Sequence, residues 1–262
     1  MKGGLKMSGG IISGSVDVTT LLFMAFVLFF LILTFYLQRE SQREGFPTET
    51  DTGGKFDSKG DVWAPKPKTY LLRDGTTVQK PDYKRDPHND KMKRLAVWPG
   101  APYEPVGDPM TSGVGPGAYT LRDDKPDLTH EDLPKIVPMR ILPDFSVAEG
   151  DRDPRGMAVV GADGETAGTI SDIWVDRAEQ LVRYYEVELA EGGRKVLLPY
   201  AFANVKGKAG KVMVNAILAK HFADVPAHAS SEQVTRLEED RISAYYAGGL
   251  LYAKSDRSEA WI

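Results

Sequence analysis

Residues 170–189, with the sequence ISDIWVDRAEQLVRYYEVEL, place five carboxylates among aromatic side chains, with only Arg177 and Arg183 to balance them. Carboxylates in such a pattern could act as general acids and bases, could pass protons between titratable groups, or could form the solvated face of a β-hairpin. Acids on alternating residues are by themselves weak evidence for any of these roles. The choice between them depends on the rest of the sequence. The five acids are Asp172, Asp176, Glu179, Glu186 and Glu188.

The composition removes most other chemistry. The 262 residues carry a net charge of -4, which argues against a general nucleic-acid binder, and they include no cysteine. Disulfides, thiolate nucleophiles and sulfur-ligated metals are therefore excluded. The histidines are too scattered to provide the ligand spacing of a zinc or haem site. They are His88, His130, His221 and His228.

One segment is apolar enough to cross a membrane. Residues 18–37 read VTTLLFMAFVLFFLILTFYL, and no charged residue lies between Asp17 and Arg39. A helix rises about 1.5 Å per residue, so this run covers about 30 Å, the thickness of the hydrocarbon core of a bilayer. The run is longer than the apolar core of a signal peptide, and no small-residue cleavage site follows it. We therefore predict a tail over residues 1–17 and a retained transmembrane helix over residues 18–38.

The charges that flank the span do not set its orientation. Lys2 and Lys6 precede the span and Arg39 and Arg43 follow it, so the count of positive residues on the two sides is tied. The span contains neither a histidine nor an acid. It therefore offers no side chain of the usual kind to a chlorophyll or a haem iron, and it is expected to act by packing.

Residues 39–143 are rich in proline and glycine, which break long helices and strands. The segment also carries aromatic anchors, among them Trp63, Tyr83 and Trp98, whereas a disordered linker is poor in aromatic residues. We therefore expect an extended segment that packs on partner subunits. Within it, the sequence TYLLRDGTTVQK predicts a hairpin, because its Asp-Gly pair is a strong turn signal.

Residues 144–262 are expected to form a small antiparallel barrel or sandwich with a short C-terminal helix. Stretches with a period of two, such as residues 184–189, are separated by turns that contain glycine. The sequence SSEQVTRLEEDRISAYYAGG predicts the helix. A capping box between Ser230 and Gln233 would begin it, and the pair Gly248-Gly249 would end it.

Six blocks of sequence lie in order over nearly the whole chain, and several are long enough to be specific. They are YLQRESQREGFP, PKPKTYLL, GDPMTSGVGPGAY, ISDIWVDRAEQLVRYYEVEL, LLPYAFANVK and VTRLEEDRISAYYAGGLLYA. Together these blocks resemble the H subunit of the photosynthetic reaction centre of purple bacteria. The similarity is weakest over residues 50–63 and 82–94.

The resemblance implies an architecture and a location. The chain would have one transmembrane helix with a periplasmic N-terminus, and a cytoplasmic domain built on a PRC-type β-barrel, in the intracytoplasmic photosynthetic membrane of a bacterium. Its partners would be the L and M subunits, the core light-harvesting antenna helices and membrane lipids, and no nucleic acid. Bacteriochlorophyll, bacteriopheophytin, quinones and a non-haem iron would be held by L and M, and none of them directly by this chain.

The resemblance also implies a function without catalysis. The H subunit would cap the cytoplasmic face of L and M, support assembly and help to deliver protons to the secondary quinone. Such delivery needs titratable groups within hydrogen-bond reach of one another. The family's WVD and EQ motifs match Asp176 and Glu179, which are the first relay candidates, and Arg183 would tune their charge. The paired acids Glu238 and Glu239 are a second set.

Two departures from the family pattern affect the predicted path. Relatives can carry a carboxylate where this chain has Gln233, and relatives can present a pair of histidines before the motif KIxPM. This chain has LTHEDLPKIVPM, with the single histidine His130 followed by Glu131 and Asp132. A histidine titrates in the useful range, so His130 and Glu131 are predicted to collect protons at the surface.

Two other classes of protein stay open. A membrane-tethered PRC-barrel adaptor that recruits a soluble partner would share the span and the barrel, but it gives no reason for the aromatic, proline-rich segment. A membrane-anchored hydrolase with paired carboxylates would need a deep pocket around Asp176 and Glu179. No nucleophile beside a base, no metal motif and no phosphate-binding loop accompanies those acids in the sequence.

Overall fold

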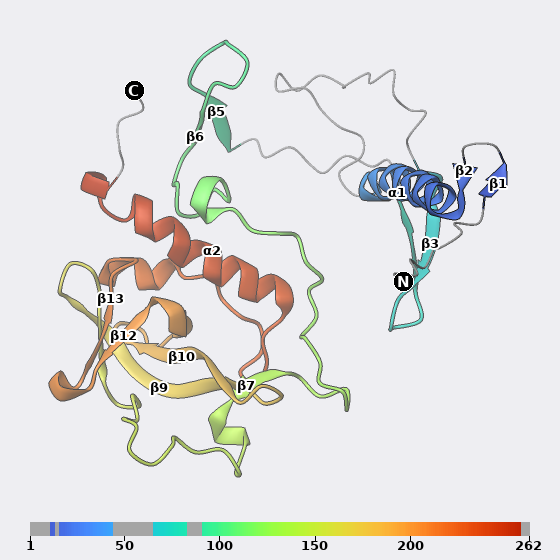
Figure 1. The fold of residues 1–262 in the computed structure, drawn as a ribbon. Coiled ribbons are helices and arrows are strands. Elements are labelled where there is room, and N and C mark those ends of the chain that lie inside the picture. The colour runs from blue at the N-terminus through green and yellow to red at the C-terminus, as the bar shows by residue number, and fades with distance from the viewer. Residues whose placement is uncertain (1–10, 14–15, 44–64, 83–90, 258–262) are drawn as a thin grey trace, which may run out of the picture. The chain divides into compact units, whose positions relative to one another are not determined.

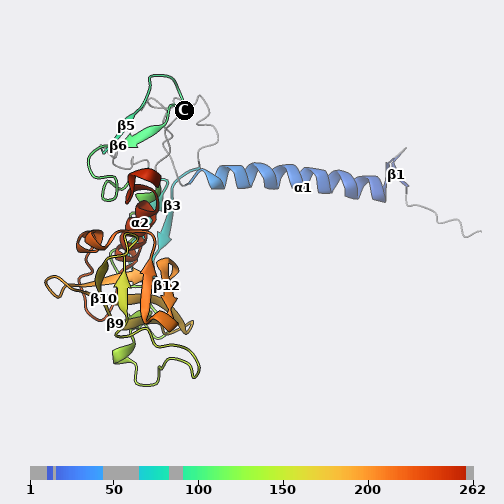
Figure 2. The same ribbon diagram turned by 90° about the vertical axis from the view of Figure 1, so that its left-hand side faces the viewer.

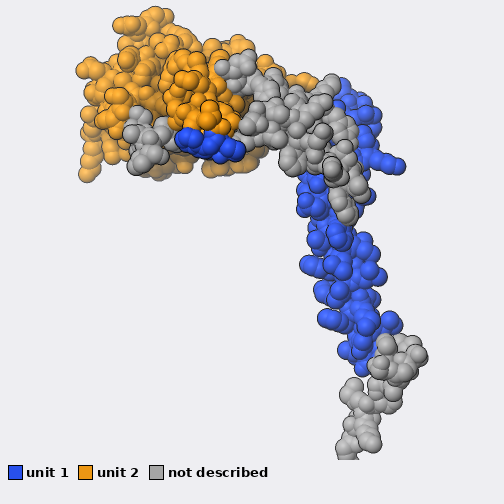
Figure 3. Space-filling view, turned by 90° about the horizontal axis from the view of Figure 1, so that it is seen from above, with its two compact units in different colours: residues 1–88, 98–100 blue, residues 89–97, 101–262 orange. Residues whose placement is uncertain are grey.

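The computed structural model describes the chain in four stretches and divides it into two compact units, coloured separately in Figure 3. Unit 1 comprises residues 1–88 and 98–100, and unit 2 comprises residues 89–97 and 101–262. Of the expected aromatic anchors, Trp63 and Tyr83 lie outside the described residues, as does most of the expected tail over residues 1–17. The described stretches are residues 11–13, 16–43, 65–82 and 91–257.

Unit 1 contains helix α1 (Val18–Ser41), which Figure 2 shows along its length. The Asp17 carboxylate caps the first turn by accepting a hydrogen bond from the backbone N–H of Thr20 (2.7 Å). No side chain of the helix is buried, and its length and composition suffice to cross a membrane. The short strands β1 (Ile11–Ser13) and β2 (Val16–Asp17) precede it as an antiparallel pair.

The hairpin expected around Asp74 and Gly75 is confirmed. Strands β3 (Lys68–Leu71) and β4 (Thr77–Lys80) pair in antiparallel fashion on either side of this turn. The Asp74 carboxylate accepts a hydrogen bond from the backbone N–H of Thr76 (3.0 Å). Gly75 has a φ of +81°, a left-handed conformation that glycine adopts without strain.

Arg43 ties the end of α1 to this hairpin and to the residues just before it. Its guanidinium makes a double hydrogen bond to the Glu40 carboxylate (2.7 and 3.0 Å). It also donates to the backbone carbonyls of Lys66 (2.7 Å) and Lys80 (3.3 Å). These contacts fix the last turn of α1, which therefore continues past its expected end at residue 38.

Unit 2 is a mainly-β domain in which a seven-stranded sheet lies against helix α2 (Arg236–Tyr252), as Figure 1 shows. The strand order is β11-β10-β9-β8-β13-β12, and β7 pairs with β9. A separate antiparallel hairpin is formed by β5 (Met92–Arg94) and β6 (Tyr103–Pro105). The strands of the large sheet are β7 (Ile136–Pro138), β8 (Ala158–Val160), β9 (Thr166–Asp176), β10 (Leu181–Leu189), β11 (Lys195–Pro199), β12 (Ala203–Lys206) and β13 (Lys211–Val214).

The expected fold class is confirmed, but the sheet is open and mixed. β11 and β12 stand at the two ends of the strand order, and the 3-10 turn η4 (Tyr200–Phe202) joins them along the chain. Among the described residues, no ladder pairs these two strands. The contact between β8 and β13 is parallel, so the prediction of an all-antiparallel sheet was wrong at this pair. Strand β8 pairs with β9 in antiparallel fashion along one edge and with β13 in parallel fashion along the other.

One strand of the large sheet precedes the expected domain boundary at residue 144. Strand β7 pairs with the end of β9, with Ile136 opposite Asp176, so it is part of the large sheet. Residues 101–143 accordingly belong to the same compact unit as the sheet. Packing of residues 39–143 on partner subunits stays a prediction.

Helix α2 begins five residues later than the predicted capping box. The observed box joins Thr235 and Glu238: each side chain accepts a hydrogen bond from the other residue's backbone N–H (3.2 and 2.8 Å). The predicted box at Ser230 does not form because the chain there is held by other contacts. The backbone N–H of Ala229 donates to the Glu238 carboxylate (2.6 Å), and the carbonyl of Ser231 accepts from a distant arginine.

The predicted end of the helix at Gly248-Gly249 was also wrong, because these glycines permit close packing inside α2. A Cβ atom at Gly249 would lie 2.3 Å from Cγ2 of Ile217 and 2.8 Å from the carbonyl oxygen of Ala216. A Cβ atom at Gly248 would lie 3.3 Å from the Cα atom of Gly117. The chain opposite α2 thus approaches the helix backbone where no side chain intervenes.

We expect Gly249→Ala to destabilise unit 2 by about 2 kcal/mol, because overpacking outweighs the gain in helix propensity. Chemical denaturation of the full chain, followed by far-ultraviolet circular dichroism, measures the change. Leu250→Ala, at the exposed neighbouring position, is the control and should change stability by less than about 0.5 kcal/mol. A stabilising Gly249→Ala would show that the helix does not need this close approach.

Candidate functional site

Asp176 shapes the turn between the two longest strands of the sheet. It is the last residue of β9 and is only 2% exposed. Its Oδ1 atom accepts hydrogen bonds from the backbone N–H groups of Ala178 (2.9 Å) and Glu179 (3.0 Å). Gln180 then adopts a φ of +56° and donates its N–H to the Asp176 carbonyl (2.8 Å). An aspartate that folds back on its own turn in this way fixes the start of β10.

Lys135 joins the two acids that the sequence singles out. Its Nζ atom lies 2.7 Å from Oε1 of Glu179 and 3.2 Å from Oδ2 of Asp176. The Glu179 and Asp176 carboxylates together raise the pKa of Lys135, so its ammonium group stays charged. Lys135 was missed at the level of sequence, although it opens the KIVPM motif. Lys135 lies beside Asp176 because β7 pairs with the end of β9, a contact between segments far apart in the sequence.

A cleft of about 250 Å³ runs between this turn and the start of α2. Three of the predicted residues, Asp176, Arg183 and Glu239, line it, while Glu179 reaches Lys135 with a side chain that is 54% exposed. Gln233 is not among the lining residues. The cleft is lined by Arg122, Asp127, Lys135, Ile136, Asp176, Arg183, Tyr184, Arg236, Glu239, Asp240 and Ser243, and we call it the acid cleft.

Glu239 is the acid in this cleft whose protonation is most clearly perturbed. Burial raises the pKa of its carboxyl above the ordinary value, and this effect outweighs a hydrogen bond from the Tyr184 hydroxyl (3.1 Å) and an ion pair with Arg183 (3.5 Å). Burial and the nearby Glu239 charge likewise raise the pKa of Tyr184. Glu239 therefore holds a proton at a higher pH than a solvated glutamate does.

The adjacent Glu238 has a different environment. Its two carboxylate oxygens accept backbone hydrogen bonds from Ala229 (2.6 Å) and Thr235 (2.8 Å), and the side chain is buried. It therefore closes the capping box and does not line the acid cleft. Glu238 and Glu239 are neighbours in the sequence, but Glu238 binds the backbone before α2 whereas Glu239 lines the acid cleft.

His130 and Glu131 are exposed in a tight turn beside the cleft. Leu128 and Pro134 form a bridge across this turn, and the Thr129 hydroxyl accepts the N–H of Glu131 (3.3 Å). The two ends of the turn, Asp127 and Lys135, both line the acid cleft, and the backbone N–H of Lys135 donates to the carbonyl of Asp127 (2.7 Å). The turn that carries His130 and Glu131 therefore begins and ends at residues of the acid cleft.

A second group of acids is buried, contrary to the simple interpretation of a solvated hairpin face. Asp172 and Glu186 face each other on β9 and β10 and are only 4% and 1% exposed. The Arg140 Nη1 atom lies between them, 3.0 Å from Asp172 Oδ2 and 3.1 Å from Glu186 Oε2. Arg140 also donates to the Ser231 carbonyl in the segment before α2.

Glu186 is the most fully paired carboxylate of this group. Burial alone would raise the pKa of its carboxyl. Hydrogen bonds from Lys195 (2.8 Å), Ser171 (2.7 Å) and Trp174 (3.2 Å) outweigh burial and, together with Arg140, lower the pKa to about 2. Glu186 therefore stays ionised at neutral pH and serves as a structural anion. The alternation of residues in β10 could not show this, because the covering segment comes from far along the chain.

The comparisons first define the class of the domain. Residues 147–220 match the family model of the PRC-barrel domain, which covers most of the open sheet described above. Residues 10–141, just over half of the chain, match the model described as photosynthetic reaction centre, H-chain N-terminal region. The chain therefore belongs to the reaction-centre H-chain family. Membership implies association with the L and M subunits in a photosynthetic membrane.

The lowered pKa of Glu186 predicts how the stability of the fold depends on pH. Its ionised form stabilises the fold above about pH 4.5, and this contribution is lost as the pH falls towards 2. Glu186→Gln should therefore lower the free energy of unfolding by about 3 kcal/mol at pH 7 and should weaken the loss of stability between about pH 5 and 2. Denaturation of the full chain at several pH values tests both points.

The matched control is Glu165→Gln, which removes a charge from the exposed turn between β8 and β9. It should leave both the stability at pH 7 and its pH dependence close to those of the unaltered chain. Equal pH profiles for Glu186→Gln and the unaltered chain would contradict the structural role of Glu186.

Proposed function

We propose that this H-chain helps to deliver protons from the cytoplasm to the secondary quinone, which the partner subunits would hold. The observation that supports this proposal best is the acid cleft, which gathers residues far apart in the sequence into one polar, partly buried space. Delivery of protons to a buried quinone needs such a series of titratable groups with ordered water between them. The chain itself would act as an accessory subunit and not as an enzyme.

The residues of the cleft and of the turns beside it would act in a definite order. His130 and Glu131 are exposed and would collect protons from water. Glu179 and Asp176 follow them, and Lys135 between these acids would balance the charge that remains when they release a proton. Glu239, whose pKa is raised by burial, would accept the proton deeper in the cleft. Here Arg183 would tune the charge of Glu239 through its ion pair.

The orientation belongs to the same proposal. Flanking charges counted along the sequence are tied, but the contacts around Arg43 bring the hairpin's lysines to the C-terminal end of α1. Lys68 pairs with Glu40 (2.8 Å), and the carbonyls of Lys66 and Lys80 both bind Arg43. Positive residues near the end of a span favour the cytoplasmic side. We therefore propose a periplasmic N-terminus and a cytoplasmic unit 2.

The remaining partners follow from this arrangement. Unit 2 would cap the cytoplasmic face of L and M and support their assembly, while the apolar side chains of α1 would meet lipids and the antenna helices of the core complex. Bacteriochlorophyll, bacteriopheophytin, quinones and a non-haem iron would reside on L and M. The tethered-adaptor alternative loses its support, because the family match includes both the span and the proline-rich segment that the adaptor left unexplained.

Removing charge from the cleft should slow the proton-coupled transfer of the second electron. The double variant Asp176→Asn, Glu179→Gln keeps an oxygen acceptor for the turn and removes both carboxylates. We expect the second-electron rate in the purified complex to fall at least about tenfold, while primary charge separation is unchanged. Glu239→Gln should slow the same step. Flash-induced absorption kinetics measure both processes.

The control for these variants is Glu191→Gln, in the exposed turn between β10 and β11, which should leave the kinetics unchanged. An unaltered second-electron rate in the double variant and in Glu239→Gln would remove the acid cleft from the proton path. Loss of primary charge separation would instead indicate a defect of assembly.

The proposed orientation can be tested by labelling, because the chain contains no cysteine. Thr76→Cys, in the β3–β4 turn, and Ser13→Cys, before α1, each introduce one thiol. A membrane-impermeant maleimide should label Thr76→Cys in vesicles whose cytoplasmic face is outward, and Ser13→Cys only in vesicles of the opposite orientation. The reverse pattern would invert the proposed topology.

A further inference from the structure

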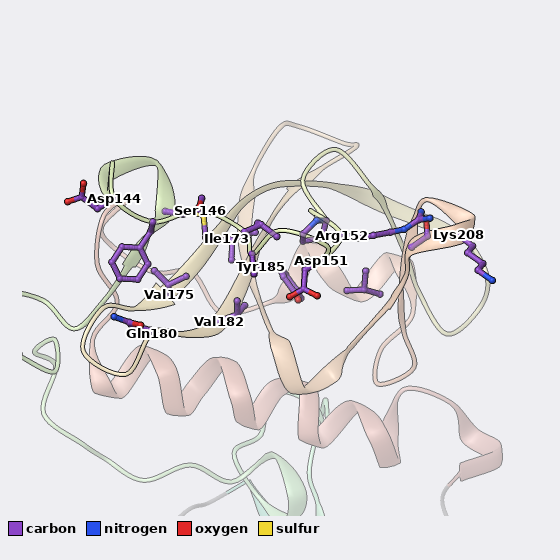
Figure 4. A pocket seen from close by; sticks show the side chains of 17 residues that line it. Asp144, Ser146, Asp151, Arg152, Ile173, Val175, Gln180, Val182, Tyr185 and Lys208 are labelled. Atoms are coloured by element: carbon purple, nitrogen blue, oxygen red, sulfur yellow. The ribbon is translucent and has the colours of Figure 1, made fainter.

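Unit 2 contains a second and larger cavity, of about 870 Å³, which Figure 4 shows from close by. Strands β9, β10 and β12 form one side, and the irregular segment 142–155 forms the other. The interiors of small β-barrels are normally filled by their own side chains, whereas ligand pockets have volumes of about 300–1,000 Å³. The sheet of unit 2 is open, and the cavity beside it has the volume of a ligand-binding site. The cavity is separate from the acid cleft.

The walls of the cavity combine apolar and polar surface in about equal parts, and the apolar part is continuous along the sheet. In Figure 4 the side chains of Ile173, Val175, Val182 and Tyr185 form a row along the sheet. Ile173 and Val175 are almost fully buried, so they form an apolar surface at the bottom of the cavity. Met139, Phe145, Val147 and Val205 complete the apolar lining. A surface of this kind fits an alkyl chain.

The charged residues at the opening have both signs. Figure 4 shows Asp144 at one end of the apolar row, Arg152 and Lys208 at the other end, and Asp151 between them. The side chains of Asp144, Asp151 and Lys208 make no hydrogen bond or ion pair with any residue in the described part of the chain. These groups are available to a ligand, and their mixed charge disfavours a headgroup that carries only one sign.

Arg152 holds the irregular segment over the cavity. Its guanidinium donates to the carbonyl of Gly207, in the 3-10 turn η5 (Gly207–Ala209) between β12 and β13. A Cβ atom at Gly207 would lie 2.2 Å from Cδ of Arg152, so the arginine stem lies directly over the glycine backbone. An arginine carries five N–H donors, so this contact leaves others to meet an anion beside Lys208.

We propose that this cavity binds a single-chain zwitterionic amphiphile. Its alkyl chain would lie along the row from Tyr185 to Val175, its anionic group would meet Lys208 and Arg152, and its ammonium group would meet Asp151. A purely cationic headgroup would be repelled by Lys208 and Arg152, and a purely anionic one by Asp151. This site is independent of the acid cleft and of proton delivery.

The test uses the full chain in lipid nanodiscs and four soluble probes with the same hexyl chain. Isothermal titration should show that hexylphosphocholine binds at least tenfold more tightly than hexyltrimethylammonium, hexyl sulfate or hexyl glucoside. Lys208→Gln and Asp151→Asn, both exposed positions, should each weaken binding of hexylphosphocholine about tenfold, because each removes one charge-assisted contact.

The matched controls are Lys206→Gln and Glu149→Gln, which remove the same charges from exposed neighbours that do not line the cavity. They should leave the affinity unchanged. Equal affinity for all four probes, tighter binding of a singly charged probe, or the same affinity in cavity and control variants would each overturn the proposal. If cavity and control variants bind with the same affinity, the measured heat comes from partition of the probe into the nanodisc lipid.

Discussion

The pairing of Arg140, at the edge of the sheet, with the buried acids Asp172 and Glu186 is the contact on which the arrangement of unit 2 depends. One guanidinium meets the middle of β9, the middle of β10 and the segment before α2. Removing a charged group from water is expensive unless its charge and hydrogen bonds are satisfied, so these elements have few other ways to come together. The network therefore determines where the chain enters α2, and α2 in turn places Glu239 in the acid cleft.

The same strands carry two groups of acids with different surroundings. Around Glu186, four donors surround one carboxylate and fix it as an anion. At the end of β9, the acids share one lysine, and one of them remains half in water. Further along the cleft, Glu239 is partly buried with weaker partners, and its pKa rises. Strong pairing thus holds Glu186 as an anion, whereas burial with weaker partners raises the pKa of Glu239 above its ordinary value.

Much of this structure could be predicted from local signals, and the failures share a physical cause. The apolar span and the Asp74-Gly75 turn depend on neighbouring residues, and both were predicted correctly. The glycines of α2 were misinterpreted as a helix end because the residues that press against them, Ile217 among them, lie distant in the sequence. Likewise Lys135 became visible as a partner of Asp176 only through the pairing of β7 with β9. Contacts between distant segments were the part that sequence patterns could not supply.

The parallel contact between β8 and β13 has a consequence for the order of folding. Strands β9 to β12 follow β8 along the chain, so β8 gains its second neighbour only after four other strands have been made. The antiparallel hairpin of β9 and β10 is local and can form early, whereas joining β13 to β8 closes a long loop at an entropic cost. Until then one edge of β8 offers unpaired backbone groups to other chains. During synthesis, the domain therefore stays incomplete, and open to incorrect strand pairing, until its last strand has left the ribosome.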